Sequence, residues 1–395
     1  MTHTTFIHSS DLQIGMTRKF LSPEAQARFD ESRERSIDAL GNLARDRGAE
    51  FIVIAGDVFE HNSLEERTLG RALEALRRLP VPVFLLPGNH DPLVADSIFS
   101  RTEDIENVTV LSSSEPIEAV DGVDIVGAPL LTKYPSDDLC AQAVRALEPS
   151  DRVRILVGHG QVEGFGTDDD EALIHLDPLE DALSRGVIDY VALGDSHSTA
   201  SLGSSGKVWF SGAPETTDYA ERSGTSGPAG SSGFSGAVAG GESDSGNALV
   251  VTVTKDGGAS EVSVDKVRTG IWTFDALGWE VTDADDVAEV IDQLRAYPDK
   301  DRTVIKYALT GTLGLEATRT LARELAALEP VFAALYERDR LMDLHLEPGE
   351  EELDNLPLTG YASQAMHQLV GEAAQGDPTA RDAVNLLFRF SQEAK

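Results

Sequence analysis

The stretch Phe51-Ile52-Val53-Ile54-Ala55-Gly56-Asp57 joins an apolar run typical of a buried strand to a Gly-Asp pair directly after it. Other short polar motifs follow apolar runs in the same way, at residues 9–13, 88–91, 158–159 and 194–197. Strand ends of one sheet lie side by side, so we expect these distant motifs to converge. They supply Asp, Asn and His with Gly beside nearly all of them, which is the ligand chemistry of a two-metal site.

Residues 1–215 alternate apolar strands with amphipathic helices, which indicates a layered α/β arrangement. Helices are expected at residues 24–47, 64–79, 139–147 and 178–185. Residues 249–267 alternate apolar and polar side chains around Asp256-Gly257-Gly258, a pattern that predicts a β-hairpin closing the sheet. His8 lies on the first strand itself, so a packed, hydrogen-bonded role is expected for it.

A second, smaller α/β unit is expected after Ile271. Its strands are expected at residues 272–274, 303–309 and 340–346, and its helices at 283–296, with Asp283 as N-cap, and 315–328. Two further helices are expected at 362–374 and 379–392. The last is apolar enough to dock either on its own unit or on a partner protein.

Residues 223–247 are dominated by Gly, Ser and Ala, a composition that predicts a flexible loop. This loop could be a disordered surface insertion or a mobile flap over the site. We therefore expect a catalytic domain at 1–268 that contains the loop, a capping domain at 269–348 and a helical tail at 349–395.

The chain has 395 residues and a formal net charge of −35, which argues against broad nonspecific binding to DNA phosphates. Basic residues cluster after the first motif and could form a solvated helix face or a DNA contact; they are Arg18, Lys19, Arg28, Arg33 and Arg35. The single Cys140 excludes an internal disulfide. No apolar run approaches the length of a membrane span and no leader pattern is seen, so a cytoplasmic location is expected.

The order of the five motifs resembles that of the calcineurin-like metallophosphoesterases. Within that superfamily, residues 7–15, 56–59 and 209–215 resemble the SbcD-type DNA repair exonucleases, and the similarity covers roughly the first two-thirds of the chain. The resemblance implies a four-layer fold: a two-sheet sandwich flanked by helices, with metals on loops at the strand ends. It also implies that the second α/β unit is the capping domain.

The resemblance further implies two divalent metal ions. One would be held by Asp11, Gln13, Asp57 and His197, and the other by Asp57, Asn89, His159 and Asp195. Asp57 would bridge the two ions, which together would activate a water for attack on phosphorus. His90 resembles the family's acid residue, and Asp91 would orient His90 through a hydrogen bond.

Two positions depart from the family pattern. Gln13 stands where the family has His, and Asp195 stands where it has the first His of its last motif. The exchange removes two imidazoles and adds a carboxylate, which favours Mn²⁺, with Mg²⁺ as the alternative, over Zn or Fe. It also leaves open a weaker site near Gln13, or a site that no longer works.

The first function that follows is a metal-dependent phosphodiesterase acting on DNA ends in repair, as an SbcD-like exonuclease and endonuclease. The resemblance implies an SbcC-type coiled-coil ATPase as partner through the C-terminal helices, and a homodimer. One alternative is a phosphodiesterase on small nucleotides, which the negative charge favours. The other is a non-catalytic DNA-repair scaffold with a degenerate metal site.

Overall fold

The computed structural model describes residues 1–164, 173–219, 241–347, 358 and 360–393. The chain divides into two compact units, Met1–Glu221 with Val238–Phe274, and Arg222–Ala237 with Asp275–Lys395. The expected domain limits at 268 and 348 stay a prediction, and the second of them lies outside the described residues. Residues 223–240 of the expected flexible loop lie outside them too.

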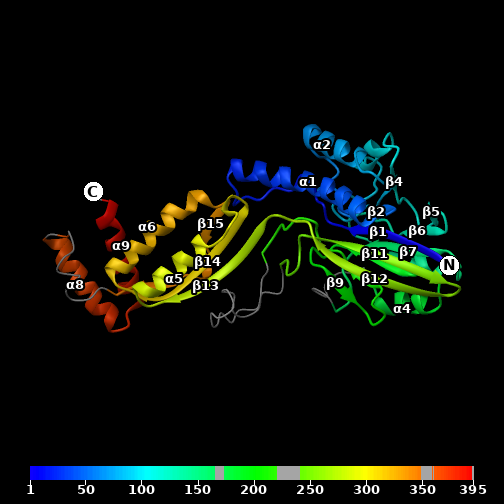
Figure 1. Cartoon of the computed structure of the whole chain (residues 1–395). Coiled ribbons are helices and arrows are strands. Elements are labelled where there is room, and N and C mark those ends of the chain that lie inside the picture. Colours follow the sequence, from blue (N-terminus) through cyan, green and yellow to red (C-terminus); the bar gives the residue numbers. More distant parts are fainter. Residues whose placement is uncertain (165–172, 220–240, 348–357, 359, 394–395) are drawn as a thin grey trace. The chain divides into compact units, whose positions relative to one another are not determined.

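The first unit contains two six-stranded sheets (Figure 1). One has the order β12-β11-β1-β2-β3-β4, with bounds Ala259–Arg268, Asn247–Asp256, Thr2–Ser9, Phe51–Ile54, Val83–Leu85 and Val108–Val110. The other has the order β5-β6-β7-β8-β10-β9, with bounds Ile117–Val120, Val123–Gly127, Val153–His159, Tyr190–Gly194, Val208–Phe210 and Ala200–Leu202. The hairpin β11–β12 is therefore confirmed, and it forms the edge of the first sheet beside β1.

Alternate residues of the central strands face alternate layers. Phe6 of β1 lies in the cluster between the two sheets, whereas its neighbour Ile7 packs beneath helices α1 (Pro23–Arg47) and α2 (Glu66–Arg77). The outer face of the second sheet is covered by α3 (Leu139–Arg145) and α4 (Leu176–Ser184). The predicted sandwich of two sheets flanked by helices is confirmed.

His8 of β1 is packed between the sheets, as predicted. Its side chain is fully buried, with Nδ1 3.1 Å from the hydroxyl of Tyr190 and Nε2 3.2 Å from the carbonyl oxygen of Leu193. Burial lowers the pKa of this imidazole to about 3. His8 is thus a neutral structural residue that links β1 to β8.

Helix α1 does not present one basic face to solvent. Arg28 and Arg35 form ion pairs one turn apart with Glu24 and Glu31. Arg33 is only 2% exposed and donates a hydrogen bond from its guanidinium to the carbonyl oxygen of Leu12. Both hypotheses for the basic cluster are therefore wrong for Arg33, which lies beneath the first motif instead.

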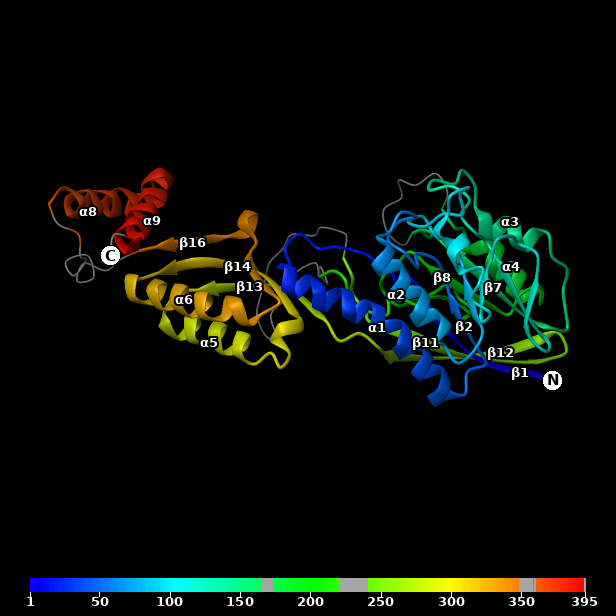
Figure 2. The same cartoon turned by 90° about the horizontal axis from the view of Figure 1, so that it is seen from above.

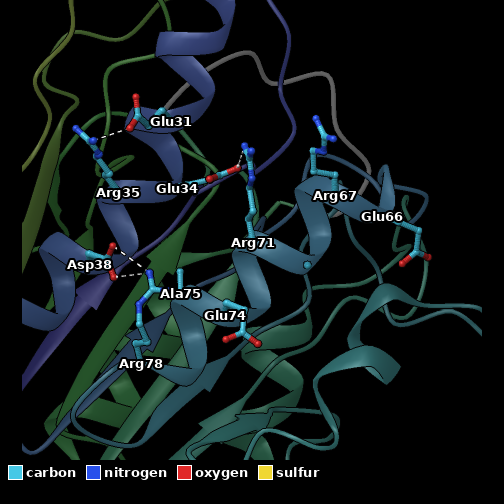
Figure 3. Close-up of a pocket in the computed structure, with 11 residues that line it drawn as sticks. Glu31, Glu34, Arg35, Asp38, Glu66, Arg67, Arg71, Glu74, Ala75 and Arg78 are labelled. Atoms are coloured by element: carbon cyan, nitrogen blue, oxygen red, sulfur yellow. Dashed lines mark hydrogen bonds and ion pairs between the residues drawn. The ribbon is translucent and has the colours of Figure 1, made fainter.

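A groove of about 490 Å³ runs between α1 and α2 (Figure 3). Its lining is almost wholly charged, and ion pairs cross it from Arg71 to Glu34 and from Arg78 to Asp38. None of the residues expected to form the site lines this groove. The charged pairs therefore join the two helices and mark no catalytic pocket.

The second unit is a smaller α/β layer (Figure 2). Its strands are β13 (Thr273–Val281), β14 (Thr303–Leu313), β15 (Ala334–Glu337) and β16 (Asp343–Leu346). Helices α5 (Ala284–Arg295) and α6 (Leu315–Leu328) cover one face, and the Asp283 side chain caps α5 as predicted. The strand predicted at 340–346 is confirmed for 343–346, whereas its start belongs to a 3₁₀ turn, Asp339–Leu341, and strand β15 was not predicted.

The chain's last two helices are α8 (Tyr361–Ala374) and α9 (Pro378–Glu393), close to their predicted bounds. Val384 and Phe388 of α9 pack with Leu346 of β16 and Met366 of α8 in one apolar cluster. The inner face of α9 therefore docks on its own unit. In the part of the chain that the structure describes, no helix is long and apolar enough to cross a membrane.

A buried ion pair links the two sheets of the first unit and generates a stability prediction. Lys255 of β11 donates to Asp189, just before β8, at 2.9 Å, and their side chains are 0% and 1% exposed. Lys255→Met leaves the Asp189 carboxylate buried without its cation, so we expect a loss of about 3–5 kcal/mol in the free energy of unfolding.

The matched control is Lys266→Met, because Lys266 pairs with Asp244 while both side chains are exposed to solvent. This variant should lose at most about 1 kcal/mol. Urea unfolding of both variants measures the difference, and equal losses would contradict the structural role of the buried pair.

Candidate metal centre

The loops after β1 and β2 run side by side. The backbone N–H of Asp11 donates to the carbonyl oxygen of Gly56 at 3.0 Å, and that of Gln13 donates to Asp57 at 2.8 Å. Since β1 and β2 are parallel neighbours, their carboxyl ends share one sheet edge. This pairing brings the first two motifs together as the sequence predicts.

Four residues other than Gly have positive φ in the part of the chain that the structure describes: Asp11 at 54°, Gln13 at 40°, Asp57 at 52° and Asp195 at 103°. All four are expected metal ligands. A left-handed backbone costs about 1–3 kcal/mol at a residue with a side chain and persists where surrounding structure enforces it. Such strain clusters at functional sites, so these four positions support the candidate site.

Asp11, Asp57 and His159 bring one ligand atom each within 4.8 Å of one another, and all three residues are buried. The Nδ1 atom of His159 lies 2.8 Å from the carbonyl oxygen of Ala55, which accepts its proton and turns Nε2 toward the cluster. There Nε2 lies 2.8 Å from Asn89 Oδ1, and 3.4 Å and 3.8 Å from carboxylate oxygens of Asp57 and Asp195.

Glycine is required beside these ligands for steric reasons. A Cβ atom at Gly56 would lie 2.1 Å from His159 Nδ1, and one at Gly194 would lie 1.9 Å from the carbonyl oxygen of Ala55. A Cβ at Gly88 would meet Asp57 Oδ1 at 2.1 Å. Any side chain at these positions would therefore push the loops apart and separate the ligand atoms.

The Gln13 side chain has a buried oxygen that a cation could bind. Its side chain is 3% exposed, and its Oε1 atom is buried without a hydrogen-bond donor among the described residues. A buried polar oxygen without a partner costs about 1–3 kcal/mol. A bound dication would satisfy this oxygen, so the donor set fits a metal at this position.

The carboxylates of the cluster act strongly on one another. The backbone N–H of Asp195 is 3.2 Å from both carboxylate oxygens of Asp11. Burial raises the pKa of Asp195 to about 6 and raises that of Asp11 as well. Burial also works to raise the pKa of Asp57, but the adjacent His159 and His90 hold it below its usual value. Such a concentration of buried negative charge is offset well by dications.

His197 has a partner that the sequence did not reveal. Its Nδ1 atom lies 2.7 Å from Glu242 Oε1 and 3.1 Å from Thr217 Oγ1. Burial would lower the pKa of His197, yet the Glu242 carboxylate raises it to about 9. Glu242 belongs to the expected flexible loop 223–247, and that prediction was wrong for the described end, where Glu242 is 5% exposed.

His90 is oriented by a residue other than the one expected. Its Nδ1 atom is 3.0 Å from the carbonyl oxygen of Glu60, and its backbone N–H donates to Asp57 at 2.9 Å. Asp91 is fully buried and accepts the backbone N–H groups of Phe59 and Gly88, so the predicted hydrogen bond to His90 was wrong. Burial raises the pKa of Asp91 to about 7. The acceptor beside His90 Nδ1 is a backbone carbonyl, which every residue type carries, so no residue in the sequence signalled it.

Comparison with known proteins agrees with this geometry. Residues 4–199 match the family model described as calcineurin-like phosphoesterase, whose members typically bind divalent metals. The uncharacterized metallophosphoesterase YhaO of Bacillus subtilis is 34% identical over 124 residues, 30% of each chain. The SbcD subunit of the nuclease SbcCD from Staphylococcus epidermidis is 26% identical over 187 residues, 40% of this chain and 48% of that protein.

The matched segments thus span less than half of either curated relative. Among solved structures, GAP50, described as the anchor in the inner membrane complex of Plasmodium, matches with a TM-score of 0.39 and 13% identity. That match covers 68% of this chain and 85% of the other, and at this score it supports no inference about function.

The raised pKa of His197 predicts how metal affinity depends on pH. A protonated ring cannot bind a cation, so binding must displace a proton at every pH below about 9. Affinity for Mn²⁺ should therefore fall as pH decreases, by up to about tenfold per pH unit for each proton displaced. Calorimetric titration with Mn²⁺ at pH 8, 7 and 6 measures this change.

Asp57→Asn is the control for the same titration, because it removes the carboxylate shared by both halves of the cluster while keeping its size. It should bind Mn²⁺ far more weakly at each pH. An affinity in the unchanged protein that is independent of pH would contradict coordination by His197.

Proposed function

We propose, since this chain carries a calcineurin-like metallophosphoesterase domain at residues 4–199, that it hydrolyses DNA phosphodiester bonds. In this proposal it acts on DNA ends as an exonuclease and endonuclease in repair. It uses two divalent ions, for which Mn²⁺ is preferred and Mg²⁺ is the alternative. The observation that carries the proposal is the meeting of Asp11, Asp57 and His159; among the described residues other than Gly, positive φ occurs at expected ligands alone.

The ligand roles proposed are those that the family resemblance implies. Asp57 lies at the centre, with Asp11, Gln13 and His197 proposed for one ion, and Asn89, His159 and Asp195 for the other. Bound dications would lower the pKa of a water and offset charge on the phosphoryl oxygens. Gln13 and Asp195 enrich the set in oxygen, which supports Mn²⁺ or Mg²⁺ over Zn.

We propose that His90 serves the leaving group. Its side chain is 32% exposed, whereas that of Asp57 is 3% exposed, so His90 stands between the buried cluster and solvent. The Glu60 carbonyl oxygen holds Nδ1, and Nε2 faces Asp57 Oδ2 at 3.9 Å. From there Nε2 can donate a proton to the leaving oxygen or a hydrogen bond to a phosphoryl oxygen.

Local charge supports phosphate binding on an acidic protein. The carboxylates of Asp11, Asp57 and Asp195 would leave one net positive charge with two dications bound. The chain as a whole carries a strong negative excess, with a net charge of −35. An anionic substrate would therefore be attracted mainly at the metal cluster.

The choice of DNA as substrate is supported by the partial match to a component of a nuclease. The net charge favours the alternative of small nucleotides, which touch only the cluster. A non-catalytic scaffold in DNA repair is the third candidate. We further propose a cytoplasmic location, a homodimer, and an SbcC-type coiled-coil ATPase as partner; the exposed Leu386 and Phe390 of α9 support the partner.

A comparison of His90→Ala with His61→Ala tests the proposal. His61 is exposed, four residues from Asp57, and its ring contacts Ser63. Loss of His90 should lower Mn²⁺-dependent cleavage of labelled DNA by about 10²-fold or more, because a positioned proton donor contributes about that factor. His61→Ala should cleave at the original rate.

Single- and double-stranded DNA and a small phosphodiester reporter are tested together. Turnover of the reporter without DNA cleavage would favour small nucleotides as the substrates. Absence of turnover on every substrate, in folded protein that binds Mn²⁺ poorly, would favour the scaffold with a degenerate metal site.

A further inference from the structure

We propose that Glu242 is a positioning residue of the metal centre, holding the His197 ring so that Nε2 faces the cation. The inference rests on the proposed function, because it assigns a partner to one of the proposed ligands. Glu242 is not in any of the five motifs. It lies 45 residues beyond His197, and the fold alone brings the two together.

The contact is a buried carboxylate against a partly exposed ring. Glu242 Oε1 lies 2.7 Å from His197 Nδ1 and also accepts the hydroxyl of Thr217. The other oxygen, Oε2, accepts the backbone N–H of Thr217 at 2.8 Å. The side chain of Glu242 is 4% exposed and that of His197 22%. Both carboxylate oxygens are thus fixed, and Oε1 is the nearer of the two oxygens beside His197 Nδ1, at 2.7 Å against 3.1 Å for Thr217 Oγ1.

The segment that carries Glu242 is anchored on the His197 side of the site. The backbone N–H of Glu242 donates to the carbonyl oxygen of Tyr219 at 2.9 Å, and that of Ser243 donates to Ser198 Oγ at 2.9 Å. The carbonyl oxygen of Asp244 accepts the backbone N–H of Thr199 at 2.8 Å. These bonds hold the carboxylate at a fixed place relative to the ring.

A second buried Glu shows what a purely structural carboxylate does here. Glu215 is 3% exposed, and the hydrogen bonds it accepts come from the backbone N–H groups of Thr216, Ile271 and Trp272. Among the described residues, it is hydrogen-bonded to no proposed ligand. Glu242 differs because its Oε1 atom is hydrogen-bonded to the imidazole of a proposed ligand, His197.

Histidines that bind metals commonly donate their other ring N–H to a carboxylate or a carbonyl oxygen, as His197 does here. A carboxylate on Nδ1–H fixes the ring orientation, leaves the lone pair on Nε2 and makes that nitrogen more basic. His159 is held in the same manner, with the carbonyl oxygen of Ala55 on its Nδ1. Both proposed imidazole ligands would therefore present Nε2 to the cluster.

The test is Glu242→Gln in the full chain, with Glu215→Gln as the matched control. Calorimetric titration with Mn²⁺ should show metal binding weakened about 10–100-fold in Glu242→Gln and nearly unchanged in Glu215→Gln. A second readout is the ¹⁵N spectrum of the histidine rings with diamagnetic Mg²⁺ or Zn²⁺ bound, with the His197 signal identified by its loss in His197→Gln. The unchanged protein should show His197 protonated at Nδ1 and coordinated through Nε2, and Glu242→Gln should lose this pattern.

Thr217→Val is a second variant that keeps the test decisive if Glu242→Gln does not fold. It removes the hydroxyl that touches both Glu242 and His197, so a few-fold weaker affinity is expected. If folded Glu242→Gln keeps both the Mn²⁺ affinity and the His197 signal of the unchanged protein, the inference is overturned. If Glu242→Gln does not fold, the same result in Thr217→Val overturns it. Failure of the unchanged protein to bind Mn²⁺ would instead overturn the proposed function.

Discussion

The pairing of the loops after β1 and β2 is the constraint on which the site depends. Two backbone hydrogen bonds, from Asp11 to Gly56 and from Gln13 to Asp57, lock three left-handed residues into one strained edge. Left-handed backbone at Asp and Gln is unfavourable, so the sandwich beneath must supply the free energy that keeps it. Ligand atoms of Asp11 and Asp57 then lie within 4.8 Å of each other and of one on His159, a spacing that suits a cation.

The sequence predicted what depends on local pattern. Each motif follows its strand, so the gathering of Asp57, Asn89 and His159 could be expected from parallel strand ends, and the glycines prove to be required by close approach. The partners of the expected residues could not be predicted. Glu242 reaches His197 across 45 positions through a segment whose composition resembles a linker.

Burial also explains why the partners of Asp91 and Arg33 could not be predicted from the sequence. The family resemblance implied that Asp91 orients His90, but the Asp91 carboxylate accepts the backbone N–H groups of Phe59 and Gly88 instead. Arg33 has the charge of a surface residue, yet it sits beneath Leu12. Sequence alone shows charge and spacing, whereas these roles are set by which side of a loop or helix the fold covers.

The most direct measurement of the central claim is an anomalous difference map from crystals of the full chain grown with Mn²⁺. Two peaks about 3.5–4 Å apart, on either side of the Asp57 carboxylate, are predicted. Asp11 and Gln13 should contact one of them, and Asn89 and His159 the other. A single peak, or none near Asp57, would contradict a two-metal centre built on the paired loops.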